Sequence, residues 1–463
     1  MKTRSVVLIL GVVAVLALGG YAAWQSSWVR SWLLPDSENA AEIDRAGSVA
    51  LKNDAPQEVT AGSPQWRGPS RKGVAAAGSF RTDWDKTPPQ ELWRVPIGGG
   101  FGSCSVVAGK LYVQDKQGHQ ERVVCLDAET GQQVWEYRYD PPRLGRIGYD
   151  SGPRATPTVD GNWVFTVGES GRLLAIEATA AGPQVRWMHD LVTEFHAKLP
   201  EWGVAGSPLV YRDMVIVQPG GTDAAVVAFD KTTGQVKWQS GSHPPSYSSP
   251  VVAAVAGQDT IFAFMGDALL AVRPSDGTIT DRFKWSTLHN ANIATPLVVS
   301  DDTTNTYVFI SAAYSSGSAL LRAERSGDEV KLVKVYERRG RGYQNHHATS
   351  VYKDRHIFGI DGQNGLNGLK CIEFSTGKEV PDWGERSIGQ ASLILAGEHL
   401  ILQSATGHLY LVEANPKEFH LIAKTPKILS GNNNWASPVL VDGRIYLRDE
   451  QHVVCLDVRR PPP

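Results

Sequence analysis

The sequence predicts an all-β fold, an eight-bladed β-propeller of four-stranded antiparallel blades that is closed by an N-terminal strand and preceded by one transmembrane helix. Two short patterns alternate along most of the 463 residues, at a spacing close to the roughly 40 to 50 residues of a propeller blade. A single hydrophobic core stops growing near roughly 250 to 300 residues, so this length favours an array of repeats. The two ends of the chain also carry complementary parts of one repeat.

The first pattern is a small residue followed by Pro, a β-rich stretch and a tight turn. Weaker copies surround Ser105, Ser350 and Leu393, which brings the total to eight. Eight copies predict eight blades. The clear copies are ATPTVDGNWVF (155–165), GSPLVYRDMVIV (206–217), SSPVV (248–252), ATPLVV (294–299) and ASPVLVDGRIYL (436–447).

The second pattern is a strand ending in an acidic residue, a Thr-Gly turn and a strand carrying Trp, as in LDAETGQQVW (126–135), FDKTTGQVKW (229–238) and IEFSTGKEVPDW (372–383). The acidic side chain accepts hydrogen bonds from the turning backbone, and Gly takes the positive φ of a tight hairpin. Trp on the outer strand is expected to fill the gap between blades and bury about 150 to 250 Å². The residues expected to do so are Trp93, Trp135, Trp187, Trp238, Trp285 and Trp383.

The ends of the chain complete each other. LWRV (92–95) is a Trp strand with no three strands before it, whereas residues 435–458 supply three strands with no Trp strand after them. Pairing the two segments would complete the last blade and remove an open edge from the ring. The sequence therefore predicts closure by the N-terminal strand.

Residues 1–34 have the features of a signal anchor. Lys2 and Arg4 precede an uncharged run, residues 6–23, that is long enough for a membrane helix. The charge rule predicts a single-pass protein of a bacterial inner membrane, with a cytoplasmic N-terminus and a periplasmic propeller. Small residues near Ala17 leave signal cleavage, and a secreted or periplasmic chain, as the alternative. Residues 35–63 are predicted to be a flexible linker, and residues 64–463 the propeller.

The composition is that of a globular protein, with 42% hydrophobic and 20% charged residues and a net charge of −2. This charge offers no broad attraction to phosphate backbones, so no nucleic-acid partner is expected. Cys125, Cys371 and Cys455 hold one repeat position in three different blades. Cys104 falls on the inner strand of the blade whose third strand holds Cys125, too far away for a disulfide, so buried free thiols are expected.

The acidic-x-x-Thr-Gly…Trp units resemble those of the PQQ-repeat propellers of the quinoprotein-dehydrogenase-like superfamily, over residues 64–458. The segments QWRGPSRKGV (65–74), SGPRATPTVDG (151–161) and NHHATSVYKDRHIFG (345–359) are similar to a bacterial group of anchored or secreted repeat proteins. The superfamily implies one of two functions. One is oxidation of alcohols or sugars with PQQ and Ca²⁺, and the other is scaffolding, as in the BamB-like subunit of the outer-membrane β-barrel assembly machinery.

The enzymes of this superfamily stack PQQ against a ring of two adjacent bonded cysteines, hold Ca²⁺ with Glu and Asn, and use an Asp base. Here no two cysteines are adjacent and no Cys-x-x-Cys-His haem signature occurs. His346 and His347 are neighbours on a predicted strand and should point to opposite faces, so no metal site is expected from them. The sequence favours a non-catalytic binding or scaffolding propeller without a cofactor, with a divergent PQQ-dependent oxidoreductase as the alternative.

A partner site is expected on the loops that run from each Trp strand to the next Pro strand, because these loops gather on one face of a propeller. They are rich in Arg, His, Asn and aromatic residues, as recognition surfaces are. Their charges are also separated, with Arg in two loops and Asp190, Glu194 and Glu201 in a third. The ligand is expected to be a protein segment or a small molecule. The residues proposed to bind it are Arg143, Arg146, Arg154, Trp202, His243, Tyr247, His289, Asn292, Arg341, Tyr343, Asn345 and Trp435.

Overall fold

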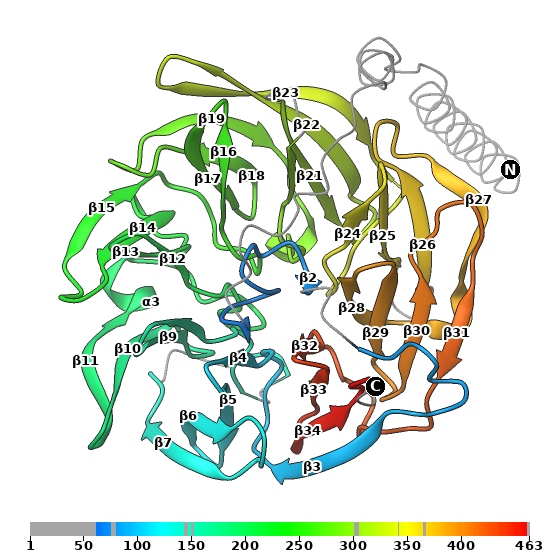
Figure 1. Cartoon of the computed structure of the whole chain (residues 1–463). Coiled ribbons are helices and arrows are strands. Elements are labelled where there is room, and N and C mark those ends of the chain that lie inside the picture. The colour runs from blue at the N-terminus through cyan, green and yellow to red at the C-terminus, as the bar shows by residue number, and fades with distance from the viewer. Residues whose placement is uncertain are drawn as a thin grey trace, which may run out of the picture. The chain divides into compact units, whose positions relative to one another are not determined.

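The computed structural model describes residues 62–75, 80–142, 147–149, 152–300, 305–340, 342–363 and 367–460. Within these ranges the chain forms eight antiparallel sheets arranged around a central axis (Figure 1). The predicted eight-bladed β-propeller is therefore confirmed. The predicted membrane segment and linker lie outside the described residues, apart from Gly62 and Ser63. No helix in the described ranges is long and apolar enough to cross a membrane.

Each of the first four blades runs outward from the axis as four consecutive strands. Blade 1 is β4 (Ser105–Val107), β5 (Lys110–Gln117), β6 (Gln120–Asp127) and β7 (Gln133–Tyr139). Blade 2 is β8 (Thr158–Asp160), β9 (Trp163–Val167), β10 (Arg172–Thr179) and β11 (Gly182–Asp190). Blade 3 is β12 (Leu209–Tyr211), β13 (Met214–Val217), β14 (Val226–Asp230) and β15 (Val236–Ser240). Blade 4 is β16 (Val251–Val255), β17 (Gln258–Phe264), β18 (Ala268–Val272) and β19 (Ile279–Lys284).

Blades 5 to 7 repeat this order, and blade 8 takes its outer strand from the N-terminal part of the chain. Blade 5 is β20 (Leu297–Ser300), β21 (Thr306–Ala312), β22 (Gly317–Ser326) and β23 (Glu329–Arg338). Blade 6 is β24 (Val351–Lys353), β25 (His356–Asp361), β26 (Gly368–Glu373) and β27 (Glu379–Glu385). Blade 7 is β28 (Ala391–Ala396), β29 (His399–Ser404), β30 (Leu409–Glu413) and β31 (Leu421–Lys424). Blade 8 is β32 (Val439–Val441), β33 (Arg444–Arg448), β34 (His452–Asp457) and β3 (Gln90–Pro96).

Strand β3 closes the ring as the sequence predicts. It pairs antiparallel with β34 and places Trp93 opposite Cys455. The same register recurs in blades 1 and 3, where Trp135 faces Cys125 and Trp238 faces Ala228. All four cysteines are free and buried, as expected, and burial raises the pKa of each thiol to about 12.

Trp side chains join neighbouring blades through the turn between the third and fourth strands of the next blade. Trp238 Nε1 donates to the Pro274 carbonyl of the next blade at 2.9 Å, and Trp187 Nε1 donates to the Lys231 carbonyl at 3.0 Å. The turn glycine lies directly against the indole, since a Cβ added at Gly277 would come within 2.5 Å of the Trp238 ring. Glycine is thus required here both for its φ of 75° and for the space. Trp93 and Trp383 make the equivalent bonds at 3.3 and 2.7 Å.

Two of the six predicted Trp residues differ from this pattern. Trp135 is only half-buried and packs against Tyr112, with 5.9 Å between ring centroids. Trp285 does not hold the repeat position, because β18 places Asp281 opposite Ala271. Asp281 joins the blades in another way, by accepting a hydrogen bond from the Leu332 amide at 2.7 Å. Trp285 lies beyond the end of β19, fully buried in the core between blades 4 and 5.

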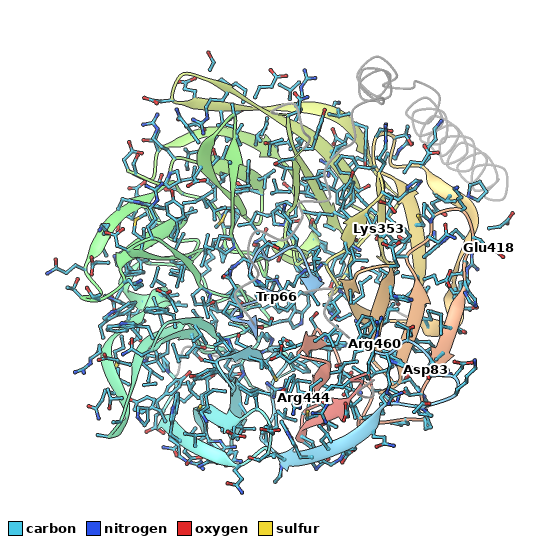
Figure 2. All side chains as sticks on the ribbon, in the orientation of Figure 1. Trp66, Asp83, Lys353, Glu418, Arg444 and Arg460 are labelled. Atoms are coloured by element: carbon cyan, nitrogen blue, oxygen red, sulfur yellow. The ribbon has the colours of Figure 1, made fainter. Side chains whose placement is uncertain are left out.

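The segment 62–75, which we call the axial plug, lies at the centre of the ring of blades (Figure 1). It hydrogen-bonds to residues beside the inner strands of blades 4 to 6. Its strand β1 (Gly62–Ser63) pairs antiparallel with β4, and β2 (Val74–Ala75) pairs parallel with β28. Trp66 reaches blade 5, where its Nε1 donates to Thr295 Oγ1 at 2.9 Å (Figure 2). The sequence analysis assigned residues 64–75 to the propeller but did not predict that they occupy the axis.

Candidate functional site

The two ends of the channel differ. The loops between blades and the turns between second and third strands lie on one side, the loop face, and the remaining turns lie on the other, the turn face. Gly62 pairs with Val107 and Ala75 pairs with Ala396, and both partners stand at the turn-face ends of their strands. The axial plug therefore enters from the turn face and returns to it. The described chain begins on the side opposite the loops predicted to bind a partner.

Aromatic side chains from six of the inter-blade loops and from the β21–β22 turn of blade 5 form a connected set on the loop face, which we call the aromatic ring. Trp202, which follows the short helix α3 (Leu191–Glu194), contacts His289 of the turn η2 (Leu288–Asn290), with 5.4 Å between ring centroids. His289 contacts Tyr314 at 5.9 Å, and Tyr314 contacts His346 at 5.4 Å. The members are Phe101, Tyr149, Trp202, His289, Tyr314, His346, His347 and Trp435.

The other half of the aromatic ring centres on Trp435. His346 stacks on His347 at 3.9 Å, and His347 lies 4.3 Å from Trp435. Trp435 then stacks on Phe101 at 4.7 Å and meets Tyr149 edge-on at 5.9 Å. Between blades 6 and 7 the turn η3 (Arg386–Ile388) is followed by Gln390, which hydrogen-bonds to His347 Nδ1.

Backbone contacts join Tyr149 to Trp202 and so close the aromatic ring. The Gly148 amide donates to the Glu201 carbonyl at 2.8 Å. A Cβ at Gly148 would lie 2.7 Å from the Trp202 indole, so this close approach requires glycine. Ring contacts thus run from Trp202 to Tyr149 around the channel mouth, and the Gly148 backbone completes the circuit.

Arg154 holds one side of the aromatic ring in place. Its guanidinium donates to the Gly152, Gly148 and Tyr149 carbonyls at 2.7 to 2.9 Å and lies 3.5 Å from a Glu169 carboxylate oxygen. It also lies over the Phe101 ring at 5.4 Å. Only 10% of the side chain is exposed. In this structure Arg154 binds the loop rather than presenting its charge to solvent.

His346 and His347 are uncharged near neutral pH, and His289 lies 2.9 Å from a Glu201 carboxylate oxygen. Burial lowers the pKa of His346 to about 4. The pKa of His347 falls well below its ordinary value, chiefly through burial and also through the adjacent His346. The aromatic ring therefore offers aromatic faces and neutral hydrogen-bonding groups rather than an electrostatic potential that is positive or negative throughout.

Five of the predicted site residues lie beneath this surface. Asn292, Tyr343 and Asn345 are at most 2% exposed, and their side chains bond within the loops. His243 is 8% exposed and pairs with Asp267 at 2.8 Å. Tyr247 is 6% exposed and supports Trp202, with 5.5 Å between ring centroids. These residues shape the loops, whereas Trp202, His289 and Trp435 reach the ring. Arg143, Arg146 and Arg341 lie outside the described residues.

The separated loop charges noted in the sequence are partnered within the fold. Asp190 pairs with Arg172 at 2.8 Å, and Glu194 pairs with His189 at 2.6 Å. Arg339, which follows β23, lies over the Trp285 ring at 3.6 Å. Sequence reasoning gave weight to these charges and missed Phe101 and Tyr314. The signal for Phe101 was available, since it is the only large side chain in the stretch 98–102 between a Trp strand and the next inner strand.

The residues present do not fit a PQQ–Ca²⁺ site. Cys104 and Cys125 lie in blade 1, Cys371 in blade 6 and Cys455 in blade 8. No two of these thiols could therefore form the disulfide ring of sequence-adjacent cysteines that stacks on PQQ. Across the described ranges, no group of three or more His, Cys, Asp or Glu side chains is placed to hold a metal ion. No oxidation step is therefore derived for this chain.

Similarity to known proteins agrees with the architecture. The family described as "Outer membrane protein assembly factor BamB" matches residues 11–146 and 119–380. A curated relative, "Outer membrane protein assembly factor BamB" of Burkholderia pseudomallei, is 29% identical over 194 residues, which are 41% of this chain. The matched part spans only 42% of that relative's length.

Solved structures share the fold at low sequence identity. A "Europium-containing methanol dehydrogenase" is 11% identical with a TM-score of 0.62, over 84% of this chain and 89% of that one. BamB from Moraxella catarrhalis is 13% identical with a TM-score of 0.55, over 80% of this chain and 99% of that one. Quinohemoprotein alcohol dehydrogenase from Comamonas testosteroni is 13% identical with a TM-score of 0.60, over 92% and 85%. On the family match, which extends over more than half of its length, this chain belongs to the BamB family of PQQ-like repeat β-propellers.

Proposed function

We propose that this chain is a non-catalytic scaffold of outer-membrane protein assembly, which captures a protein partner on the aromatic ring of its loop face. The observation that carries the proposal is the chain of ring contacts that links six inter-blade loops and the β21–β22 turn on one face of the propeller. Trp and Tyr dominate the binding energy of protein interfaces because they bury large areas at small entropic cost. Family membership and the name of the Burkholderia relative support the assembly role.

The surface offers exposed apolar area next to side chains that are already ordered. Tyr149 and Leu288 are each 62% exposed and stand on the two sides of Trp202. Covering a large apolar side chain contributes roughly 1.5 to 3 kcal/mol. Since the ring side chains hold one another in place, little further entropy is lost when a partner binds. A partner with an apolar or aromatic segment suits this surface.

We further propose that residues 1–34 anchor the chain in the inner membrane and that residues 35–63 act as the linker. The described chain enters the propeller from the turn face, opposite the aromatic ring, and we place the propeller in the periplasm. Fractionation tests this arrangement. We expect the full chain in the membrane fraction, with the propeller accessible to protease only after the outer membrane is opened. A mature soluble chain that starts near residue 20 would instead establish the secreted form.

The partner surface is tested by site-specific photocrosslinking in intact cells. A photoreactive residue at Tyr149 or Leu288 should give adducts with subunits of the outer-membrane assembly machinery. The matched controls are Val134 and Val236 on the outer strands β7 and β15, which are 48% and 44% exposed and should give none. Adducts from the outer strands alone would refute the proposal, as would no machinery adduct from either loop position.

A further inference from the structure

A cavity of about 260 Å³ lies between the axial plug and the inner strand β32 of blade 8. No member of the aromatic ring lines it, since the lining comes from the plug, Phe80, Ser103, Ile394 and residues 437–443 of blade 8. The volume exceeds by far the roughly 10 to 15 Å³ that one water needs, so the cavity is large enough for a small solute together with several waters. Its polar lining includes Ser63, Arg67, Ser103, Ser437 and Asp442.

The two arginines of the axial plug are both buried, but only one of them is saturated. Arg71 uses its whole guanidinium: Nε donates to Gln65 Oε1 at 2.8 Å, and the two terminal nitrogens donate to the Ser207, Pro208 and Pro250 carbonyls and to Thr158 Oγ1. Arg71 does not line the cavity. Every nitrogen of the Arg71 guanidinium therefore donates to an oxygen atom.

Arg67 differs in both respects. Its terminal nitrogens donate to the Leu393, Lys72 and Ser350 carbonyls at 2.7 to 3.2 Å, while its Nε is buried without a partner in the described part of the chain. Arg67 lines the cavity and is 6% exposed. Each of its hydrogen bonds goes to a neutral carbonyl oxygen, so a buried positive charge and one donor remain uncompensated at the cavity.

Ser437 is the second uncompensated donor, and the repeat shows that this is exceptional. In other blades the side-chain hydroxyl of the residue directly before the repeat Pro accepts a hydrogen bond from a backbone amide of the adjoining blade. Ser207 Oγ accepts from the Thr156 amide and Ser249 Oγ from the Ser207 amide, each at 2.9 Å. The equivalent Ser437 Oγ is buried without a partner among the described residues, and Ser437 lines the cavity.

We propose that this cavity binds a small oxyanion of the phosphate or carboxylate class, with Arg67 Nε and the Ser437 hydroxyl as donors. An oxyanion supplies acceptors and negative charge, which are the two things that these side chains lack. Burial lowers the pKa of Arg67 to about 9, so the side chain is still charged at neutral pH, and a bound anion would offset the cost of that charge. Asp442 lines the cavity as well, so the anion should sit on the plug side of it.

The test uses the purified full chain in detergent, with inorganic phosphate and acetate as probes and chloride as the reference at equal ionic strength. Calorimetry and thermal unfolding should show saturable binding of at least one probe, with a melting temperature that rises with its concentration. Comparison of the two probes identifies the preferred class. A melting temperature that follows ionic strength alone, with no binding heat from either probe, would overturn the proposal.

Two serine variants separate binding from stability. Ser437→Ala should weaken the apparent affinity at least tenfold without lowering the melting temperature in chloride, because its hydroxyl makes no hydrogen bond to any described residue. Ser207→Ala is the matched control, since it removes a bonded hydroxyl at the same repeat position and should lower the melting temperature while leaving the affinity unchanged. Equal affinity in Ser437→Ala and wild type would refute the assignment. Partner capture is tested separately, by the crosslinking positions Tyr149 and Leu288, which do not line the cavity.

Discussion

The contact between Trp238 and Gly277 can be tested by a double-mutant cycle. Trp238 is 8% exposed, and removing a buried indole of this kind costs about 3 to 5 kcal/mol of unfolding free energy. Gly277→Ala should cost about 1 to 2 kcal/mol for its left-handed φ of 75°. Its Cβ would also meet the indole at 2.5 Å, and relieving that clash should add a further cost of about 2 kcal/mol.

The clash disappears once the indole is gone, so the two changes should not be additive. We expect the double variant to be about 2 kcal/mol more stable than the sum of the single effects, measured by urea unfolding. Gly257→Ala is the matched control. Gly257 has a φ of 80° with nothing within 4 Å of an added Cβ, so its cost should be the same with and without Trp238. A Gly277→Ala cost that does not depend on Trp238 would refute the inter-blade contact.

Four further outcomes are expected. Deleting residues 90–96 should cause aggregation or a large fall in melting temperature, whereas deleting 35–61 should not, since only the first removes a closing strand. Trp435→Ala should reduce crosslinking at Leu288 while keeping the fold, and capture by the wild type should persist in high salt because the ring is largely uncharged. Burial raises the pKa of Glu121 to about 7 from 4.5, so stability should fall as pH rises through this interval, and Glu121→Gln should flatten that dependence in melting temperatures taken at pH 5 and pH 8. Adding PQQ and Ca²⁺ to the purified protein should produce neither quinone absorbance nor dye reduction with alcohols, and turnover would restore the oxidoreductase alternative.

The blade count and the closure could be predicted because they depend on local chemistry. An acidic residue, a Thr-Gly turn and a Trp at fixed spacing specify one hairpin, and the hairpin recurs until the ring is complete. The position of Trp285 shows where this reasoning fails. Sequence spacing made it resemble a docking Trp, but the register of β19 gives that place to Asp281, which uses a hydrogen bond instead of an aromatic face.

The candidate site was less predictable, because it depends on loops that meet only in the closed ring. Phe101 and Trp435 are far apart in the sequence and stack at 4.7 Å. Asn292 and Asn345 are residue types common at recognition surfaces, yet their amides donate to the Met265 and Ile360 carbonyls of neighbouring segments, and nothing in the local sequence distinguishes this role. The axial plug has no hydrophobic period, and its arginines bind backbone carbonyls that any blade could offer.

The axial plug and the closing strand both come from residues 62–96, and their partners include β28, β32 and β34 near the other end of the chain. A chain that is exported N-terminus first therefore delivers these segments long before the strands that they complete. Until the C-terminal strands are present, the plug lacks its contacts with β28 and β32 and the ring keeps an open edge. Under the proposed export, folding of this propeller would therefore wait for complete translocation, and a prematurely ended chain would present to proteases the unpaired strands that the finished protein conceals.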